Sequence, residues 1–255
     1  MGALVGAGGG RPPRIPGRDR QALLHAPESV APARDAALPA QASRAAARAA
    51  VTSKYGPQAE RWTDDAYADA ASYLAHRAEL IVGLGPRLEP GDTVLDLACG
   101  DGGLADHLPG LRYLGVDASA EMVTAARRRG REVALGDLNE YEPAEHVAAT
   151  TCFRAIYYAR NRAAFFAHVA AYTDRKLVFD LNPRQYPLAA VRADLGHAGF
   201  DELEVRPFFA PQRVSLPRPA LAALHVLERG GPFARLLLRY RFSLLCAAFR
   251  GGRNS

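Results

Sequence analysis

The residues from Asp96 to Gly103 have the composition of a ligand-binding turn. They read Asp-Leu-Ala-Cys-Gly-Asp-Gly-Gly and directly follow the apolar pair Val94 and Leu95. Glycine has no Cβ, so its backbone can adopt positive φ angles and approach a bound group closely. Where such a turn opens a helix, the free N–H groups favour an anionic or carboxylate-bearing ligand. The stretch therefore predicts a binding loop between a buried strand and a helix.

Two more acidic residues follow apolar segments at comparable positions. Asp117 comes directly after residues 113–116, and Asp137 follows residues 132–135 and Gly136. In an open α/β sheet, ligands lie at the carboxyl ends of the strands, so the turn and both acids would meet at one edge. Asp117 could accept hydrogen bonds from ribose hydroxyls, and Asp137 from the exocyclic amine of adenine. Together the three features predict a nucleoside site.

The rest of the pattern supplies the elements that would position this site. Apolar strand segments alternate with amphipathic helical segments, which favours parallel pairing in a doubly wound α/β sheet. The expected strands are 93–97, 113–116, 132–135, 147–153, 176–181, 202–207 and 239–249. The expected helices are 62–84, 120–129, 163–172, 188–198 and 221–229, together with one that starts at 104–108. Ser119 is the expected cap of the helix over 120–129.

The spacing of these features resembles the class I S-adenosylmethionine-dependent methyltransferases. Their first motif, acid-x-Gly-x-Gly-x-Gly, corresponds to Asp96-x-Ala98-x-Gly100-x-Gly102, with alanine where the family usually has glycine. The sequence Asp117-Ala118-Ser119-x-x-Met122 is similar to the second motif, and Gly136-Asp137-Leu138 to the third. The resemblance covers roughly residues 54–250. It implies a mostly parallel seven-stranded sheet whose last strand is antiparallel, with S-adenosyl-L-methionine as cofactor.

The resemblance also implies which other residues meet the cofactor. In this family the segment before the sheet commonly covers the methionine end of the cofactor, and Tyr55 and Trp62 lie there. A sulfonium beside an aromatic ring is a favourable cation–π arrangement. The residues expected to bind the cofactor are Tyr55, Trp62, Asp96, Ala98, Cys99, Gly100, Gly102, Asp117, Ala118, Met122, Asp137, Leu138, Phe153 and Arg154. Tyr157 and Tyr158, together with Arg154, are the residues expected to face the methyl acceptor.

Two other interpretations fit parts of the same pattern. Gly100-x-Gly102-x-x-Ala105 matches the nicotinamide-dinucleotide fingerprint, so an NAD(P)-dependent oxidoreductase is one alternative. Against it, about 40 plausibly folded residues precede the first strand, and Asp137 has no role on a pyrophosphate. A non-catalytic S-adenosylmethionine-binding protein is the second alternative. A deep methyl-acceptor cavity would favour the enzyme, and a filled one the binding protein.

Composition limits the partners that we expect. Of the net charge of +5, residues 1–50 carry +4 from seven arginines and three acidic residues, so residues 51–255 are close to neutral. A near-neutral core does not indicate nucleic-acid binding, and no apolar run is long enough for a membrane helix. We expect a small-molecule methyl acceptor, no nucleic-acid or membrane partner and no metal, since the histidines show no ligand spacing. The sequence does not predict an oligomeric state.

Domain organisation and location follow from the same composition. Residues 1–50 are rich in Ala, Arg, Gly and Pro and are expected to be disordered, with residues 51–255 forming the methyltransferase domain. A natural start near Val51 is an equally good hypothesis. Cys99, Cys152 and Cys246 are odd in number and widely spaced, which favours a reducing, cytoplasmic location. Methyl transfer needs a base only when the methyl acceptor must lose a proton, and no catalytic residue is assigned.

Overall fold

The computed structural model describes residues 56–230, 234 and 243–251. The expected disordered segment, residues 1–50, and Tyr55 lie outside this part of the chain. The described elements, in chain order, are η1 (Gly56–Arg61), α2 (Trp62–Ala66), α3 (Ala70–Gly83), β1 (Thr93–Leu97), η2 (Gly103–His107), β2 (Arg112–Asp117), α4 (Ala120–Arg128), β3 (Val133–Leu135), β4 (Val147–Cys152), η3 (Ile156–Tyr158), α5 (Arg162–Ala170), β5 (Thr173–Leu181), α6 (Leu188–His197), β6 (Glu202–Phe208), α7 (Arg218–Glu228) and β7 (Ser243–Phe249).

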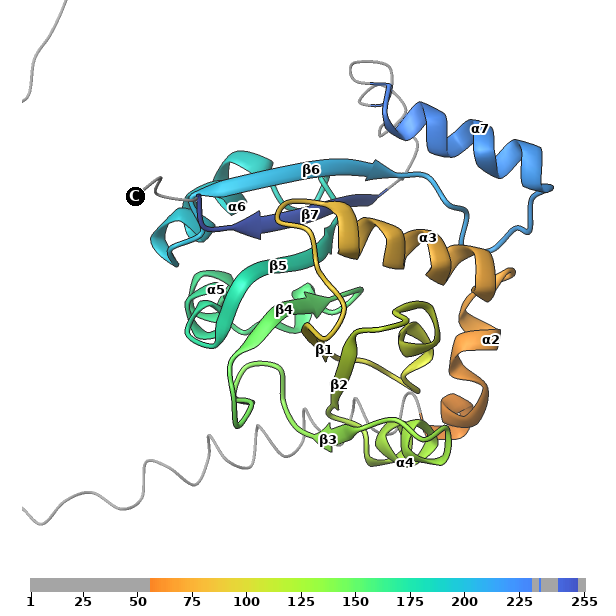
Figure 1. The fold of residues 1–255 in the computed structure, drawn as a ribbon, viewed down its shortest axis with the longest axis horizontal. Coiled ribbons are helices and arrows are strands. Elements are labelled where there is room, and N and C mark those ends of the chain that lie inside the picture. The colour runs from red at the N-terminus through yellow and green to blue at the C-terminus, as the bar shows by residue number, and fades with distance from the viewer. Residues whose placement is uncertain (1–55, 231–233, 235–242, 252–255) are drawn as a thin grey trace, which may run out of the picture.

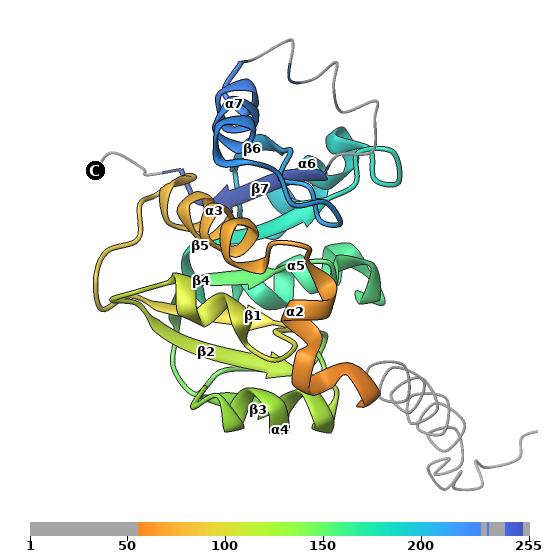
Figure 2. The ribbon, with the colours of Figure 1, turned by 90° about the vertical axis from the view of Figure 1, so that its right-hand side faces the viewer.

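The strands form one seven-stranded sheet in the order β3-β2-β1-β4-β5-β7-β6. The first five strands in the chain pair in parallel, whereas β7 lies antiparallel to both β5 and β6. In both views of the ribbon, α4 lies beside β3 at one end of the sheet and α7 lies beyond β6 at the other (Figures 1 and 2). The expected α/β class, with an antiparallel last strand, is confirmed.

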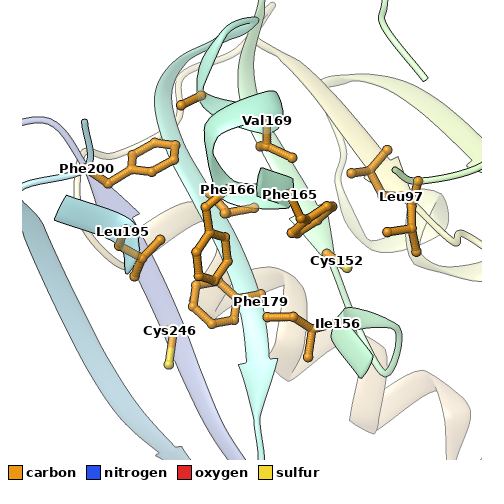
Figure 3. Close-up of a cluster of buried hydrophobic side chains, with 14 of the residues drawn as sticks. Leu97, Cys152, Ile156, Phe165, Phe166, Val169, Phe179, Leu195, Phe200 and Cys246 are labelled. Carbon is orange, nitrogen blue, oxygen red and sulfur yellow. The ribbon is translucent and has the colours of Figure 1, made fainter. Parts of the chain in front are cut away.

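Each face of the sheet is covered by a separate hydrophobic core, because successive strand residues point to opposite faces. Leu95 and Leu97 of β1 pack on the face that α5 and α6 cover, and Val94 packs on the face that α3 covers. On the α5 face, the rings of Phe166 and Phe179 lie with their centroids 5.5 Å apart (Figure 3). Asp96, between Leu95 and Leu97, therefore projects toward α3.

The register of the parallel strands brings four carboxyl ends together. Leu97 at the end of β1 is paired with Val116 of β2 and Cys152 of β4, and Asp117 is paired with Leu135 of β3. The residues that follow these strands must emerge at the same edge of the sheet. The glycine turn, Asp117 and Asp137 are neighbours for this reason.

Two expected helices, and the expected alternation of strands and helices, differ from the structure. The helix expected over 62–84 is two helices, because the chain is extended at Tyr67 and restarts at Asp69, whose side chain accepts a hydrogen bond from Ser72 N and caps α3. The helix expected from residue 104 is the short 3₁₀ helix η2. The described segment 136–146, between β3 and β4, contains neither helix nor strand, so the alternation is interrupted there.

Smaller differences affect element ends. β5 begins at Thr173, three residues before the expected start, and α7 begins at Arg218. Residues 239–242 of the expected last strand lie outside the described residues. Among the described helices, none combines the length and the apolar composition needed to cross a membrane.

Candidate functional site

A cavity of about 470 Å³ opens at the carboxyl ends of β1, β2 and β4. Its walls come from α2 and α3, from the glycine turn, and from the segments that follow β2, β3 and β4. The residues that line it are Trp62, Thr63, Tyr67, Leu74, Arg77, Asp96, Ala98, Cys99, Gly100, Asp101, Gly103, Leu104, Asp117, Ala118, Met122, Gly136, Asp137, Leu138, Asn139, Phe153, Arg154, Ala155, Tyr157, Tyr158 and Arg160. The volume lies within the range typical of small-molecule sites.

The glycine turn has the backbone geometry that its sequence predicts. Ala98, Gly100 and Gly102 have φ angles of 59°, 59° and 72°, so three alternate residues adopt the left-handed conformation. An added Cβ on Gly100 would lie 2.8 Å from Cδ1 of Trp62, which leaves no room for a side chain there. Gly102 shapes the start of η2 and does not line the cavity.

Asp117 holds the turn in place through its carboxylate. One oxygen accepts a hydrogen bond from Gly100 N at 2.8 Å, and the other accepts one from Ser119 N at 2.9 Å. Burial raises the pKa of Asp117, and the backbone hydrogen bonds from Ser119 and Gly100 partly oppose this shift. Because each carboxylate oxygen can accept two hydrogen bonds, Asp117 retains capacity for a ligand hydroxyl.

Asp96 is buried at the end of β1, beneath the turn. Tyr113 donates a hydrogen bond to Asp96 at 2.9 Å, and Thr151 donates one at 2.6 Å. Burial raises the pKa of Asp96 to about 6, although both hydrogen bonds favour the ionised form. A cationic group in the cavity would further favour the charged carboxylate.

Asp137 forms part of a polar cluster at the end of β3. It accepts hydrogen bonds from Asn139 N at 2.9 Å and Asn139 Nδ2 at 2.7 Å, and it forms an ion pair with Arg160 at 2.5 Å. Partial burial raises the pKa of Asp137, but the hydrogen bonds from Asn139 and Arg160 outweigh this effect, and the pKa falls below its usual value. Asp137 is therefore an ionised hydrogen-bond acceptor.

The short helix α2 lies across the glycine turn. The buried carboxylate of Asp101 accepts hydrogen bonds from Thr63 N and Thr63 Oγ1, and it forms an ion pair with Arg129 at 2.6 Å. These contacts hold Trp62 against Gly100. Trp62 also packs on Met122 and Ala59, and this packing anchors α2. The same side chain lines the cavity.

The opposite wall of the cavity is aromatic and cationic. Phe153 and Arg154 follow β4, and the rings of Tyr157 and Tyr158 lie 4.4 Å apart in η3. The side chain of Tyr157 is half exposed. Arg77 of α3 lies with its guanidinium carbon 4.4 Å from the centroid of the Phe153 ring.

The structure brings together most of the residues that the sequence predicts for the site. All of them line the cavity except Gly102 and Tyr55, which lies outside the described residues. The lining residues that the sequence reading missed include Thr63, Tyr67, Arg77, Asp101 and Arg160. A signal for Arg77 was present, because it lies three residues after Leu74 and four before Ile81, on the buried face of its helix.

The part of the chain that carries the glycine turn is similar to a known protein family. Residues 94–175 match the family model described as a methyltransferase domain. The matched range runs from β1 into β5 and includes the glycine turn, Asp117 and Asp137. This segment is therefore similar to a methyltransferase domain, and the seven-stranded sheet expected from the resemblance to class I S-adenosylmethionine-dependent methyltransferases is confirmed.

Curated relatives are similar over one part of the chain. A trans-aconitate 2-methyltransferase of Mycobacterium tuberculosis is 37% identical over 90 residues, which are 32% of this chain and 33% of that protein. The same enzyme of Mycolicibacterium gilvum is 36% identical over 78 residues, which are 28% of this chain and 31% of that protein. The chain thus matches about a third of the length of these relatives.

Solved structures share the fold at low sequence identity. A chain from the complex that contains the Haloferax volcanii Trm112 methyltransferase activator superposes with a TM-score of 0.57 and 21% identity, over 80% of this chain and 99% of that one. Phosphoethanolamine N-methyltransferase 2 of Haemonchus contortus superposes with a TM-score of 0.51 and 17% identity, over 69% and 53%.

The dinucleotide alternative is not supported by the geometry. A pyrophosphate site of that kind needs a regular helix whose first N–H groups point at the phosphates. Here the turn opens only the short 3₁₀ helix η2, and Ala105 of the fingerprint does not line the cavity.

Proposed function

We propose that the protein transfers the methyl group of S-adenosyl-L-methionine to a small-molecule acceptor and releases S-adenosylhomocysteine. The observation that carries this proposal is a cavity that joins the glycine turn, Asp117 and Asp137 to an aromatic wall. The partial relatives are trans-aconitate 2-methyltransferases, which supports a small acceptor because trans-aconitate is a small molecule.

The lining residues fit the parts of S-adenosylmethionine in order along the sheet edge. Asp137 and Asn139 would receive the polar edge of adenine, with Met122 and Leu138 as apolar neighbours. Asp117 would accept the ribose hydroxyls through its remaining lone pairs. Trp62 and buried Asp96 would flank the positively charged end, where an aromatic face and a carboxylate both favour a cation.

When bound, the cofactor supplies a methyl group activated by a positively charged sulfur. The nucleophile of the acceptor forms the new bond to the methyl carbon while the carbon–sulfur bond breaks and its electron pair stays on sulfur. The chain's own residues would contribute position and a water-poor environment, and positioning alone can lower a barrier by about 7–11 kcal/mol. Phe153, Tyr157 and Tyr158 would form the apolar side of the methyl-acceptor space.

Calorimetry with S-adenosylmethionine, S-adenosylhomocysteine and NAD tests the proposal first. We expect saturable one-to-one binding of the first two ligands and none of NAD. Release of S-adenosylhomocysteine in the presence of a metabolite extract then tests turnover, with labelled methyl groups identifying the product. Binding without turnover in any extract would favour the non-catalytic binding protein. Failure to bind both S-adenosylmethionine and S-adenosylhomocysteine would overturn the methyltransferase proposal and the binding-protein alternative together.

We propose that residues 51–255 form one domain and that the protein acts in the cytoplasm. The second proposal is supported by Cys99, Cys152 and Cys246, which are all free thiols in the structure.

A further inference from the structure

Arg77 is a buried cation with few polar partners. Its side chain is only 4% exposed, yet it lines the cavity. One nitrogen donates a hydrogen bond to the Tyr73 hydroxyl at 2.9 Å, a second lies 3.5 Å from the Tyr67 hydroxyl, and Nε has no partner. Arg77 forms no ion pair with any carboxylate that the structure describes. Burying a charge with no opposite charge in direct contact is costly, so an anion bound beside Arg77 would stabilise it.

The surroundings of Arg77 strengthen this requirement. Its guanidinium carbon lies 4.4 Å from the Phe153 ring centroid, 4.8 Å from that of Tyr73 and 5.8 Å from that of Phe208. Such apolar surroundings screen charges weakly, so an anion in contact with the guanidinium would be held more strongly than in water. Asp96 and Asp180 act on Arg77 only at longer range, and burial raises the pKa of both carboxyls.

A second guanidinium lies at the same end of the cavity. The carbon of the Arg154 guanidinium lies 5.8 Å from the Trp62 ring centroid and 5.9 Å from that of Tyr67. Arg154 has a φ angle of 54°, and its backbone N–H donates to Asp180 at 2.7 Å. It also lacks an ion pair with any carboxylate in the described residues. The two arginines thus both lie close to Tyr67, whose O–H can donate a further hydrogen bond.

Arg77 lies at a different part of the sheet edge from the residues expected to bind the nucleoside. The three groups expected to hold the nucleoside follow β1, β2 and β3. Arg77 instead contacts Phe153, which follows β4, and Phe208 at the end of β6. Arg77 therefore lies toward the half of the sheet that the nucleoside leaves open, and Arg154 lies by Trp62 and Tyr67.

We propose that Arg77 and Arg154, with the Tyr67 hydroxyl, form a carboxylate-binding subsite for the methyl acceptor. The acceptor is then a small organic acid whose carboxylate is paired with Arg77. This inference rests on the proposed methyltransferase function and names its substrate class. A planar guanidinium can donate two parallel hydrogen bonds to a carboxylate, which fixes orientation as well as affinity.

Calorimetry on the full chain saturated with S-adenosylhomocysteine tests the subsite. The probes are trans-aconitate and cinnamate, each compared with its fully methyl-esterified, neutral form. We expect at least one acid to bind, and its ester to bind at least tenfold more weakly. Arg77→Met should weaken binding of that acid at least tenfold and change S-adenosylhomocysteine affinity less than twofold. Arg154→Gln should weaken binding of the acid about threefold.

A matched control comes from Arg250, which also lies by an aromatic ring. Its guanidinium carbon is 5.8 Å from the Phe200 ring centroid, and it donates to the Ala170 carbonyl at 2.7 Å, away from the cavity. Arg250→Met should bind the acid as the natural protein does. If Arg77→Met does not fold, the exposed Arg154→Gln and the conservative Tyr67→Phe carry the test, each with an expected loss of about threefold.

Other outcomes overturn the inference and remain distinguishable from failure of the proposed function. Equal binding of acid and ester, no binding of either acid, or unchanged binding by the variants would each reject the subsite. If Arg77→Met weakens S-adenosylhomocysteine tenfold but leaves 5′-methylthioadenosine unaffected, the arginine holds the carboxylate of the cofactor, and the assignment to the methyl acceptor is wrong. If the natural protein binds no S-adenosylhomocysteine, the proposed function itself fails.

Discussion

Asp117 shows how one side chain can shape a turn and remain available to a ligand. Its oxygens already accept backbone hydrogen bonds from Gly100 and Ser119. The sequence predicted the location of this carboxylate at the end of a strand. It could not predict the hydrogen bond to Gly100, because that contact depends on the register between β1 and β2.

We predict that Asp117→Ala weakens S-adenosylmethionine binding by about 100-fold. The substitution removes the proposed ribose contact and leaves the buried N–H of Gly100 without its partner, and such a loss costs roughly 1–3 kcal/mol by itself. Titration calorimetry measures the effect. Asp174→Ala, at an exposed carboxylate in β5, is the control and should bind normally. An unchanged affinity for Asp117→Ala would refute the assigned role.

Gly100 provides a second test at the level of a single residue. We predict that Gly100→Val abolishes S-adenosylmethionine binding, because the new Cβ would collide with Trp62 at a φ of 59°. Gly130→Val is a matched control, since Gly130 has a φ of 75° and open space around its Cβ position. The control should lose stability and retain binding in calorimetry. Normal binding by Gly100→Val would show that the turn is misplaced.

The sequence predicted a residue of the site where a local sequence pattern, such as a glycine-rich turn or an acid after a strand, identified it. The glycine turn and the acids after two strands carry such patterns, so they were found. Asp101 and Arg160 were missed because their function depends on distant partners, Thr63 and Asp137 respectively. Sequence spacing contains no signal for contacts of that kind.

Among the elements, α2 depends most on one buried contact. It has only five residues, which is too short for a helix to be stable alone. The carboxylate of Asp101 fixes it through both the N–H and the hydroxyl of Thr63. The position of the cavity wall above the glycine turn therefore depends on Asp101.

We predict that Asp101→Ala lowers the free energy of unfolding by about 2 kcal/mol and weakens S-adenosylmethionine binding by at least tenfold. The variant leaves buried donors of Thr63 without an acceptor and breaks the ion pair with Arg129. Urea denaturation and calorimetry measure the two effects. Asp64→Ala, at an exposed site on the same helix, should change neither quantity appreciably. Loss of stability with normal S-adenosylmethionine binding would show that the position of α2 does not determine cofactor affinity.

The order of the elements was predicted well, and their ends less well. Strand patterns of apolar residues identified all seven strands, because strands buried in a sheet that helices cover need a largely apolar sequence. The break between α2 and α3 was missed, since Tyr67 continues the apolar periodicity that precedes it. The capping interaction of Asp69 with Ser72, rather than the periodicity, determines where α3 starts.

At the scale of the molecule, the sheet buries acidic side chains on the face that α3 covers. Burial raises the pKa of Asp96 to about 6, and it raises the pKa of Asp180 as well. A carboxyl whose pKa is raised in the folded state stabilises the fold at low pH, when it is protonated. That contribution is lost as the pH rises through the folded-state pKa.

We predict that Asp96→Asn alters the pH dependence of stability. A rise from the ordinary value of 3.8 to about 6 corresponds to roughly 3 kcal/mol, lost by the natural protein between pH 4 and pH 7. The stability of the variant relative to the natural protein should increase by about this amount over that interval. Urea denaturation at each pH provides the measurement. Parallel curves for the two proteins would contradict the raised pKa, and Asp64→Asn should give parallel curves as a control.

The chain has a single tryptophan, and it is the residue that lies against Gly100. Tryptophan emission responds to the polarity of its surroundings and is quenched by nearby groups. Any molecule that enters the cavity beside the indole must change this signal, without contributions from a second indole elsewhere. The protein therefore carries an intrinsic optical reporter of cavity occupancy, and stopped-flow fluorescence can follow entry and exit of ligands without an added label.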